Sequence, residues 1–257
     1  MMPKHLWKDW GRVVSIIRAS NNVFVLLDYD GTLTPIVERP EDAHLSPETR
    51  NLLTILSKKR GYKVGIVSGR VLEDVKKLVG LANLYYVGNH GLELSGPDIE
   101  FVHPEAKELA RSVSKIYEEL KSELDGIEGV IVENKTLTVS IHHRNTPAEK
   151  IEMVKQKVKK VVGRWQHLQL TEGKKVLEVK PKLDWNKGRA AQLLIWRVAP
   201  ESLLIYAGDD ATDEDAFKQL RRGVTILVTS TPIQTNAKYY LRDPNEVKEL
   251  LKRLVAL

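Results

Sequence analysis

Two aspartates follow an apolar run directly in the stretch VFVLLDYDGTLTP, which covers residues 23–35. Residues 23–27 are continuously apolar, which is typical of a strand that is covered on both faces. Asp28 and Asp30 come at once behind this run, and residues i and i+2 of an extended segment point to the same side. Both carboxylates can therefore approach one substrate together. Aspartate is also common in turns, so a plain turn at the strand end is the alternative.

Other apolar runs also end in polar side chains. These are Ser68, Gly69 and Arg70 after residues 63–67, Asp209, Asp210 and Asp213 after residues 202–208, and Lys187 at the start of a helical pattern. Ligands of open α/β sheets bind beyond the carboxyl ends of the strands. We therefore expect all these side chains at one edge of a sheet.

The residue types at this edge suit phosphoryl transfer. Crowded carboxylates repel one another unless a cation or a proton intervenes, and oxygen ligands without any cysteine favour Mg²⁺ over zinc. Ser68, the backbone amides beside it and Lys187 could hold phosphate oxygens, although Ser68 could instead cap a helix and Lys187 could be a surface lysine. Asp28 suits a nucleophile that becomes an aspartyl phosphate. Asp30 suits a general acid that later activates water.

Strand-like and helix-like segments alternate along most of the chain. The expected strands are 23–27, 63–67, 83–87, 202–208 and 224–228, and the expected helices are 47–60, 71–79, 187–199, 213–220 and 245–254. This order predicts an α/β fold with a Rossmann-like, doubly wound parallel sheet. The helical spacing of Trp10, Val13, Val14 and Ile17 indicates an amphipathic helix rather than a signal peptide.

Residues 104–181 have a different pattern and are expected to form an inserted α+β domain. Its expected elements are a helix at 104–124, strands at 129–134 and 136–144 joined around Asn134-Lys135, a helix at 147–163, and strands at 166–170 and 175–180 joined around Glu172-Gly173. Hairpins make the sheet of this αββαββ unit largely antiparallel. The remaining residues, 1–103 and 182–257, are expected to form the catalytic core.

The chain resembles the haloacid dehalogenase (HAD) superfamily of phosphatases, because it has the four motifs of that superfamily in the same order. These motifs are DYDGT, SGR, a lysine at a helix start and GDDATDED. The resemblance implies that Asp28 is the nucleophile and Asp30 the acid and base. Ser68, Gly69 and Lys187 would bind phosphate. Mg²⁺ would be bound by Asp28, Asp209 and the carbonyl of Asp30. Asp213, and with it Asp210, would support the metal site.

The position of the insertion narrows this resemblance. It lies between the third expected strand and Lys187, as in HAD phosphatases with a type II (C2) cap, which act on sugar phosphates. Four segments are similar to those of the trehalose-6-phosphate phosphatases. They are GNHGLE (88–93), IHHR (141–144), LEVKPKLDWNKGRA (177–190) and GDDATDEDAF (208–217). One departure is Trp185-Asn186 before Lys187, where family members often have aspartate. The resemblance implies hydrolysis of trehalose 6-phosphate in trehalose biosynthesis, with a trehalose-phosphate synthase as a possible partner.

The substrate-binding residues expected on this basis are Arg70, Asn89, His90, Glu93, Arg144, Glu178 and Lys180. Glu178 and Lys180 are two residues apart on a strand and so share a face, with Val179 pointing into the interior. Arg144, at the end of the neighbouring strand, is their expected companion. A plain surface ion pair between Glu178 and Lys180 is the alternative. His142 and His143 point to opposite faces, which favours structural roles for both.

Composition limits the other classes of function. The net charge is +6, but basic and acidic residues are interspersed, so a basic nucleic-acid-binding protein is the less favoured alternative. No apolar run approaches the roughly 20 residues that span a bilayer, and we expect a cytoplasmic protein with no membrane partner. A phosphatase for another sugar phosphate, such as sucrose 6-phosphate or mannosyl-3-phosphoglycerate, stays open because the core motifs are shared.

Overall fold

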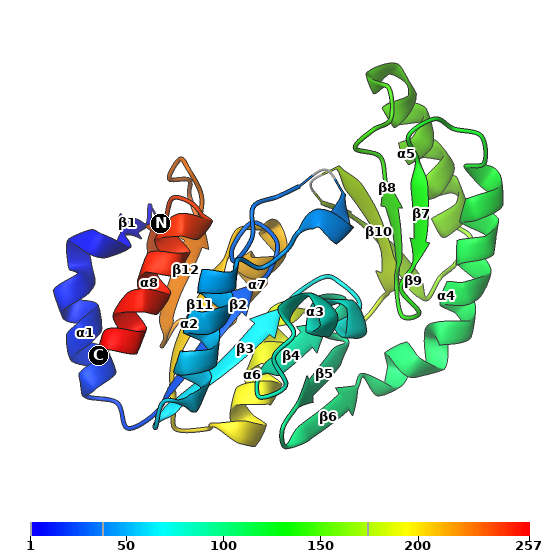
Figure 1. Cartoon of the computed structure of the whole chain (residues 1–257). Helices are drawn as coiled ribbons and strands as arrows, with labels where there is room; N and C mark the ends of the chain where they lie inside the picture. The colour runs from blue at the N-terminus through cyan, green and yellow to red at the C-terminus, as the bar shows by residue number, and fades with distance from the viewer. Residues whose placement is uncertain (1, 38, 174) are drawn as a thin grey trace. The chain divides into compact units, whose positions relative to one another are not determined.

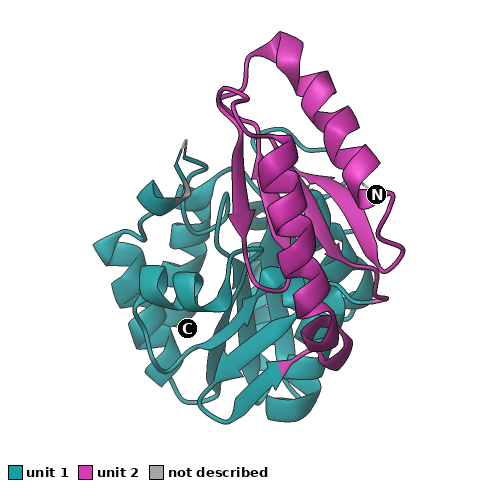
Figure 2. Cartoon of the chain, turned by 90° about the vertical axis from the view of Figure 1, so that its right-hand side faces the viewer, with its two compact units in different colours: residues 1–101, 185–257 teal, residues 102–184 magenta. Residues whose placement is uncertain are grey.

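Two compact units make up the chain in the computed structural model, which describes residues 2–37, 39–173 and 175–257 (Figure 2). Unit 1 consists of residues 1–101 and 185–257, and unit 2 consists of residues 102–184. Unit 2 is thus an insertion in the sequence of unit 1. The segment 104–181, expected to be a separate domain, falls within unit 2.

A mostly parallel sheet forms the centre of unit 1 (Figure 1). Its strands are β1 (Lys4–His5), β2 (Val23–Asp28), β3 (Tyr62–Val67), β4 (Tyr85–Gly88), β5 (Glu93–Gly96), β6 (Ile99–Val102), β11 (Leu203–Gly208), β12 (Val224–Val228) and β13 (Tyr239–Leu241). Their order is β1-β13-β12-β11-β2-β3-β4-β5-β6. Every strand from β1 to β4 in this order pairs in parallel, whereas β5 is antiparallel to β4. The sequence analysis missed β1, β5, β6 and β13.

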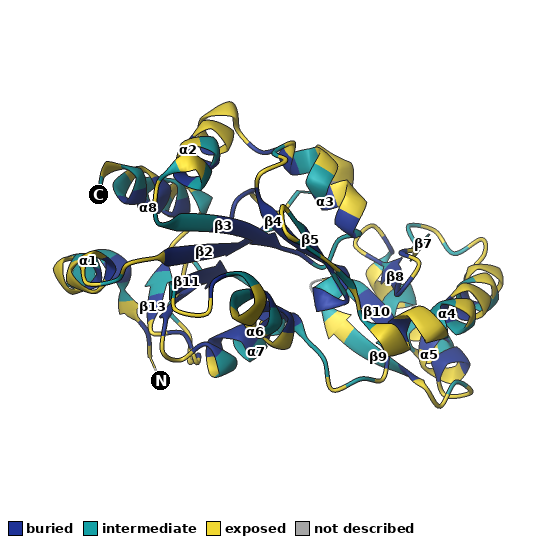
Figure 3. Cartoon of the chain, turned by 90° about the horizontal axis from the view of Figure 1, so that it is seen from below, coloured by how far each residue is buried: buried dark blue, intermediate teal, exposed yellow. Residues whose placement is uncertain are grey.

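Helices cover both faces of this sheet (Figure 3). The helices of unit 1 are α1 (Trp10–Arg18), α2 (Pro47–Lys58), α3 (Leu72–Val79), α6 (Lys187–Val198), α7 (Ala211–Gln219) and α8 (Pro244–Ala256), with 3-10 turns at Leu6–Asp9, Pro40–Asp42 and Asn89–Gly91. One core cluster joins α1, α2, α3 and α8 to the sheet, and a second joins α6 and α7 to its other face.

Alternation along β2 explains its continuously apolar sequence. Val23, Val25 and Leu27 belong to the first core cluster, and Phe24 and Leu26 belong to the second. All six residues of β2 are buried, because successive side chains enter opposite covered faces. Asp28 is two residues after Leu26 and four after Phe24, so it lies on the same face of the strand as these two residues. Its side chain is therefore directed to the face that α6 and α7 cover.

Side-chain caps fix where α6 and α7 begin. The side chain of Asn186 accepts a hydrogen bond from the backbone N–H of Arg189, so Lys187 becomes the first residue of α6. The side chain of Asp210 accepts from the N–H of Thr212 and starts α7. Both helices thus begin at the carboxyl edge of the sheet, where β2 and β11 end.

Unit 2 is an antiparallel sheet with two helices on one face. Its elements are α4 (Pro104–Glu123), β7 (Ile131–Asn134), β8 (Val139–His142), α5 (Ala148–Val162), β9 (Leu168–Gly173) and β10 (Val176–Pro181). The strand order is β7-β8-β10-β9. The expected turn around Glu172-Gly173 is wrong, because both residues still pair within β9.

The two faces of this sheet differ in polarity. Val139, Ile141, Leu177 and Val179 pack with apolar residues of α4 and α5. The alternate positions, on the opposite face, carry Glu133, Ser140, His142, Glu178 and Lys180. We call these five residues the polar face of unit 2. Among the described residues of both units, no helix is long and apolar enough to cross a membrane.

Candidate active site

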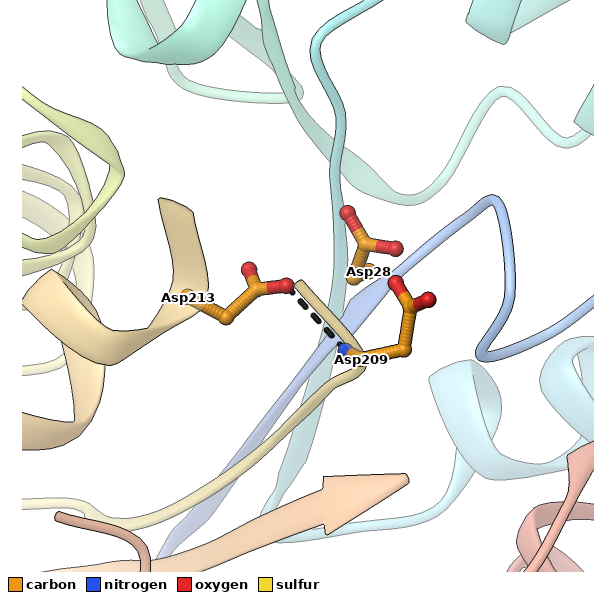
Figure 4. Close-up of side chains that lie close together, drawn as sticks. All are labelled: Asp28, Asp209 and Asp213. Atoms are coloured by element: carbon orange, nitrogen blue, oxygen red, sulfur yellow. Dashed lines mark hydrogen bonds between the residues drawn. The ribbon is translucent and has the colours of Figure 1, made fainter. Parts of the chain in front are cut away.

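Three carboxylates converge at the carboxyl edge of the unit 1 sheet (Figure 4). Asp28 is the last residue of β2, Asp209 follows the adjacent strand β11, and Asp213 lies in the first turn of α7. One oxygen atom from each residue lies within 4.8 Å of the others. The parallel pairing of β2 with β11 produces this convergence, since both strands end at the same edge.

Asp213 is held by four hydrogen bonds and organises its neighbours. One oxygen accepts from Lys187 Nζ at 3.0 Å and from the Tyr206 hydroxyl at 2.7 Å. The other oxygen accepts from the backbone N–H of Asp209 at 3.2 Å (Figure 4). It also accepts from the backbone N–H of Asp210 at 3.1 Å. These contacts use the lone pairs of a fully buried carboxylate. Asp213 thus positions Lys187 and Asp209, and Asp28 and Asp209 are the better placed of the three to bind a cation.

Lys187 lies between two carboxylates and is not a surface lysine. Its Nζ is 2.7 Å from Asp28 and 3.0 Å from Asp213, and its side chain is only 3% exposed. Burial alone would lower the pKa of Lys187, but Asp213 and Asp28 outweigh burial and raise this pKa. The ammonium is therefore charged. Three carboxylates facing a single ammonium leave an excess of negative charge, which a cation can balance.

Asp28 is a buried acid whose charge is only partly compensated. Burial raises its pKa well above the usual range, Lys187 opposes this shift, and Asp213 and Asp209 add to it. A cation bound beside Asp28 would favour the ionised form, which is the form that can act as a nucleophile. A plain strand-end turn does not account for an acid held in this environment.

Asp30 lies beside Arg70 rather than in the carboxylate cluster. The Arg70 guanidinium donates two hydrogen bonds, each 2.7 Å long, to the two oxygens of Asp30. This fork fixes the plane of the carboxylate. The sequence analysis assigned Arg70 to the substrate, whereas the structure shows it orienting the expected acid and base.

Gly31 allows the loop after Asp30 to approach Asp209. Its φ is +81°, and a Cβ atom there would lie 2.3 Å from a carboxylate oxygen of Asp209. Any other residue would be strained in this conformation and would also displace Asp209. The glycine in DYDGT is therefore required by the carboxylate cluster as well as by the turn.

The segment after β3 forms a tight loop around Ser68. Ser68 is buried, and its Oγ accepts from the N–H of Arg70 at 3.1 Å. The alternative in which Ser68 caps the next helix does not hold, because α3 has Val71 as its N-cap, without a side-chain hydrogen bond. A Cβ atom on Gly69 would be 2.4 Å from the His90 ring, so this glycine is needed for close packing.

Asn89 and His90 are backbone outliers that hold this loop. Their φ angles are +46° and +57°, a region that residues other than glycine seldom adopt. The N–H of Asn89 donates to the Arg70 carbonyl at 2.7 Å, and that of His90 to the Ser68 carbonyl at 3.2 Å. The Asn89 side chain donates to Glu93 at 2.5 Å. Strain of this kind persists where the surroundings over-determine it, which is common at functional sites.

Trp185 and Asn186, where the sequence departs from the family pattern, support the start of α6. Trp185 Nε1 donates to the Gly91 carbonyl at 2.7 Å, and its ring packs against Phe101 at 5.9 Å between centroids. Asn186 caps the helix. Both residues hold Lys187 in place, so the departure leaves the lysine position intact.

In unit 2, Glu178 pairs with Lys135, which the sequence analysis missed. Lys135 Nζ donates to Glu178 at 2.9 Å, and the hydroxyl of Ser140, directly across the sheet, donates to the same oxygen. Both charged side chains are less than 10% exposed. Glu178 is therefore not part of an exposed surface couple with Lys180. The alternation of side chains in a hairpin could have predicted that Glu178 shares a face with Ser140. It could not have predicted that the Lys135 side chain extends from the turn to Glu178.

The expectation that Arg144 ends the neighbouring strand is wrong. Strand β8 ends at His142, and Arg144 lies in the following turn, where it is exposed. Since Glu178 faces Ser140 in the antiparallel register, Arg144 is four residues further along, roughly 13 Å at 3.3 Å per residue. Lys180 is half-buried near the opposite end of the same strand pair.

The two adjacent histidines occupy different surroundings. His142 bonds to Glu133 at 2.8 Å on the polar face. Burial alone would raise the pKa of Glu133, but the bond to His142 and the charge of Lys135 lower it. His143 is buried, and burial together with Lys155 lowers its pKa. The polar face thus holds two charged contacts, Glu133 with His142 and Glu178 with Lys135.

Comparison with known proteins decides the family. The model of the trehalose-phosphatase family matches residues 26–245. The chain belongs to the trehalose-phosphatase family. It is 37% identical to probable trehalose-phosphate phosphatase 3 of Oryza sativa subsp. japonica, over 96% of this chain and 73% of the relative. It is 39% identical to probable trehalose-phosphate phosphatase G of Arabidopsis thaliana, over 92% of this chain and 69% of the relative.

Solved structures of trehalose-6-phosphate phosphatases share the fold of this family member. A trehalose-6-phosphate phosphatase related protein matches with a TM-score of 0.80 and 26% identity, over 91% of this chain and 97% of the other. The C-terminal domain of the C. albicans trehalose-6-phosphate phosphatase matches with a TM-score of 0.82 and 24% identity, over 100% and 99%. The predicted α/β fold class and the predicted family are confirmed.

The donor set of this trehalose-phosphatase family member fits a hard divalent cation. Asp28 and Asp209 offer carboxylate oxygens, and the chain has no cysteine thiolate. The absence of a side chain at Gly31 leaves room for the Asp209 carboxylate. Oxygen ligands in small number are what Mg²⁺ accepts while it retains water and phosphate.

Proposed function

We propose that this chain is a Mg²⁺-dependent phosphatase that hydrolyses trehalose 6-phosphate to trehalose and phosphate. The observation that carries the proposal is the position of Asp28, which is buried at a strand end, bonded to Lys187 and grouped with Asp209. The family match supplies the class of substrate. A phosphatase needs a nucleophile, a cation and an anion cradle, and this edge of the sheet provides the residues for all three.

In the proposed mechanism, an oxygen of Asp28 attacks phosphorus, and the bond from phosphorus to the sugar oxygen breaks. Asp30 gives the leaving oxygen its proton, and the product on the enzyme is an aspartyl phosphate. A water molecule then attacks this phosphorus while Asp30 takes its proton, which regenerates free Asp28 and releases phosphate. The Arg70 fork orients Asp30 in its ionised form, which is the form that takes the proton of the attacking water.

Lys187 and the metal site share the neutralisation of charge. The Lys187 ammonium beside Asp28 compensates negative charge that arrives with the phosphate. Mg²⁺ bound at Asp28 and Asp209, together with the Asp30 carbonyl, would supply further electrostatic stabilisation of the phosphoryl oxygens. The hydroxyl of Ser68 would donate to the same group, whereas the Ser68 N–H already donates to the Val87 carbonyl. Phosphate binding by Gly69 stays a prediction.

We further propose that the polar face of unit 2 recognises the sugar. The catalytic residues act on the phosphoryl group and cannot by themselves distinguish one sugar from another. The residues of this face, together with Lys135, which is paired with Glu178, offer donors and acceptors suited to hydroxyl groups. Such a site rejects analogues that leave its polar groups unpaired.

An assay of released phosphate tests the proposal. The panel contains trehalose 6-phosphate, sucrose 6-phosphate, mannosyl-3-phosphoglycerate and p-nitrophenyl phosphate, each with Mg²⁺ and with excess chelator. We expect trehalose 6-phosphate to have the highest kcat/KM and chelation to abolish turnover. A preference for another sugar phosphate would leave the mechanism standing and overturn the substrate; undiminished activity after chelation would overturn the mechanism. A synthase partner stays a prediction.

A further inference from the structure

A cavity lies in unit 1 at the amino ends of β11 and β12, away from the catalytic edge. It has a volume of about 580 Å³ and is bordered by Leu203, which begins β11, and by Gly223, which precedes β12. Asp209 follows the other end of β11, six residues from Leu203, which corresponds to roughly 20 Å along a strand. The cavity is therefore separate from the catalytic site, and its volume is typical of a pocket for a small organic ligand.

The charges around this cavity have one sign. Lys218, Arg221 and Arg222 line it, and none of its lining residues is acidic. Within the described part of the chain, none of these three side chains forms an ion pair. Lys218 does experience the charge of Glu214 one helical turn earlier, so Arg221 and Arg222 carry the argument. Two guanidinium groups beside a pocket favour an anion, and phosphate and carboxylate fit their planar geometry.

An exposed tryptophan lines the same cavity. Trp196 is 66% exposed, although tryptophan is usually largely buried, and the guanidinium of Arg197 lies 5.3 Å from its ring centroid. The arginine covers part of the ring and leaves the remainder open. An indole face beside two guanidinium groups suits the stacking of a flat ring that carries an anionic group.

A third feature points to a ring with a hydrogen-bond donor. Gln219, another lining residue, has a buried Oε1 atom for which the described residues provide no hydrogen-bond partner. An unpaired buried acceptor is unfavourable, and a ligand N–H group would give it a partner. The apolar floor, formed by Leu203, Leu204 and Leu220, suits the body of such a ring.

We propose that this pocket binds a small anion with a flat, N–H-bearing ring, the chemistry of a nucleoside phosphate. Trp196 would stack on the ring, Gln219 would accept its N–H, and Arg221 and Arg222 would hold the phosphates. The site contains none of the catalytic residues, although the Gln219 amide donates to Asn186, the N-cap of α6, at 3.3 Å. It does not rest on the function proposed above.

Isothermal titration with ADP tests the site on the full chain in the presence of Mg²⁺. We expect ADP to bind, and we expect Arg221→Gln/Arg222→Gln to weaken binding by about tenfold or more, since two charge-assisted contacts are lost. Trp196→Ala should weaken it by about fivefold or more. The matched control is Arg18→Gln, an exposed arginine on α1, which should leave ADP affinity unchanged. All these variants should retain wild-type unfolding temperatures and wild-type hydrolysis of p-nitrophenyl phosphate.

Three further measurements separate this site from its alternatives. Asp28→Asn should still bind ADP, because the catalytic carboxylates are not involved. Adenosine and pyrophosphate should each bind about tenfold more weakly than ADP, because each lacks one of the two recognised groups. The proposal is overturned if ADP affinity is the same in wild type and in the pocket variants, or if pyrophosphate binds as tightly as ADP. It is also overturned if sedimentation shows a wild-type dimer that Trp196→Ala dissociates, because a second copy would then cover Trp196.

Discussion

The Nζ atom of Lys187 lies 2.7 Å from an oxygen of Asp28, and the two side chains are only 3% and 6% exposed. The pair has formed across a sequence separation of 159 residues, because α6 begins where β2 ends. A buried ion pair of this kind is weak evidence for stability, since desolvation opposes it. The pair instead places the Lys187 ammonium next to the expected nucleophile Asp28, where the ammonium can attract a phosphate and Asp28 can bind a cation.

Removal of the lysine charge should be strongly destabilising. Lys187→Met leaves Asp28 and Asp213 buried without their common cation, and breaking a buried pair costs about 3–5 kcal/mol. Urea unfolding at pH 7 without metal measures this loss. Lys252→Met is the control, because Lys252 pairs with Glu48 on the surface, and its effect should be small.

The pH dependence of the same variant has a definite sign. Burial raises the pKa of Asp28, and Lys187 is the group that opposes the shift, so its loss raises that pKa further. A carboxyl whose pKa is higher in the folded state binds more protons there, so stability falls as pH rises through that pKa. Lys187→Met should therefore regain stability relative to wild type as pH is lowered from 7 towards 5. A constant difference across this range would contradict the assignment.

The two motif aspartates should differ in their effect on turnover. Asp28→Asn should abolish phosphate release, because an amide cannot form the acyl phosphate. Asp30→Asn should still bind substrate but should be about 10²–10⁴-fold slower, which is the usual cost of losing a general acid. Steady-state kinetics and trapping of the phosphorylated enzyme measure both. Full activity of Asp28→Asn would refute the mechanism.

Substitution of Gly31 should weaken metal binding. In Gly31→Ala the new Cβ would lie 2.3 Å from the Asp209 carboxylate, and the residue would also have a positive φ. We expect Mg²⁺ affinity to fall by about tenfold or more, or about 1.4 kcal/mol. Gly126→Ala is the matched control, because Gly126 has a φ of +71° and nothing within 4 Å of its Cβ position. Gly126→Ala introduces backbone strain without a clash, and it should leave Mg²⁺ affinity unchanged. If both variants lost the same amount of Mg²⁺ affinity, the clash with Asp209 would not be the cause.

Mg²⁺ binding should release protons. Burial raises the pKa of Asp28, with Asp213 and Asp209 adding to the shift and Lys187 opposing it, and a metal ligand must be deprotonated. Apparent Mg²⁺ affinity should therefore increase with pH. Calorimetric titration in two buffers of different ionisation enthalpy counts the protons released. The count should fall in Asp28→Asn, and an unchanged count would assign the proton to another group.

The catalytic edge could be predicted from the sequence because it depends on local rules. Asp28, Ser68 and Asp209 each follow a buried apolar run, and parallel strands end at one edge. Lys187 was identified by its position at a helix start, which Asn186 fixes as a cap. The signals are short in sequence, so no knowledge of tertiary contacts was needed.

What the sequence could not provide depends on contacts between distant segments. The contact between the Arg70 guanidinium and Asp30 crosses 40 residues and was not expected, while substrate binding by Arg70 stays a prediction. The pairing of Lys135 with Glu178 crosses 43 residues and depends on the exact length of the β7–β8 turn. Strands β5 and β6 were missed because GLELSG and IEFV are short and lie at the sheet edge, where the apolar pattern is weaker.

The last prediction concerns sugar specificity, which we assign to the polar face of unit 2. Glu178→Gln keeps the shape of the side chain but removes the charge that Lys135 and Ser140 share. We expect kcat/KM for trehalose 6-phosphate to fall by about tenfold or more, or about 1.4 kcal/mol, while p-nitrophenyl phosphate hydrolysis stays nearly unchanged, because that ester offers no sugar hydroxyls. Lys180→Ala should show the same split. Glu172→Gln, which breaks the Lys155 pair elsewhere in unit 2, is the control and should alter neither substrate. Equal losses on both substrates would mean that Glu178 supports the fold of unit 2 and does not select the sugar.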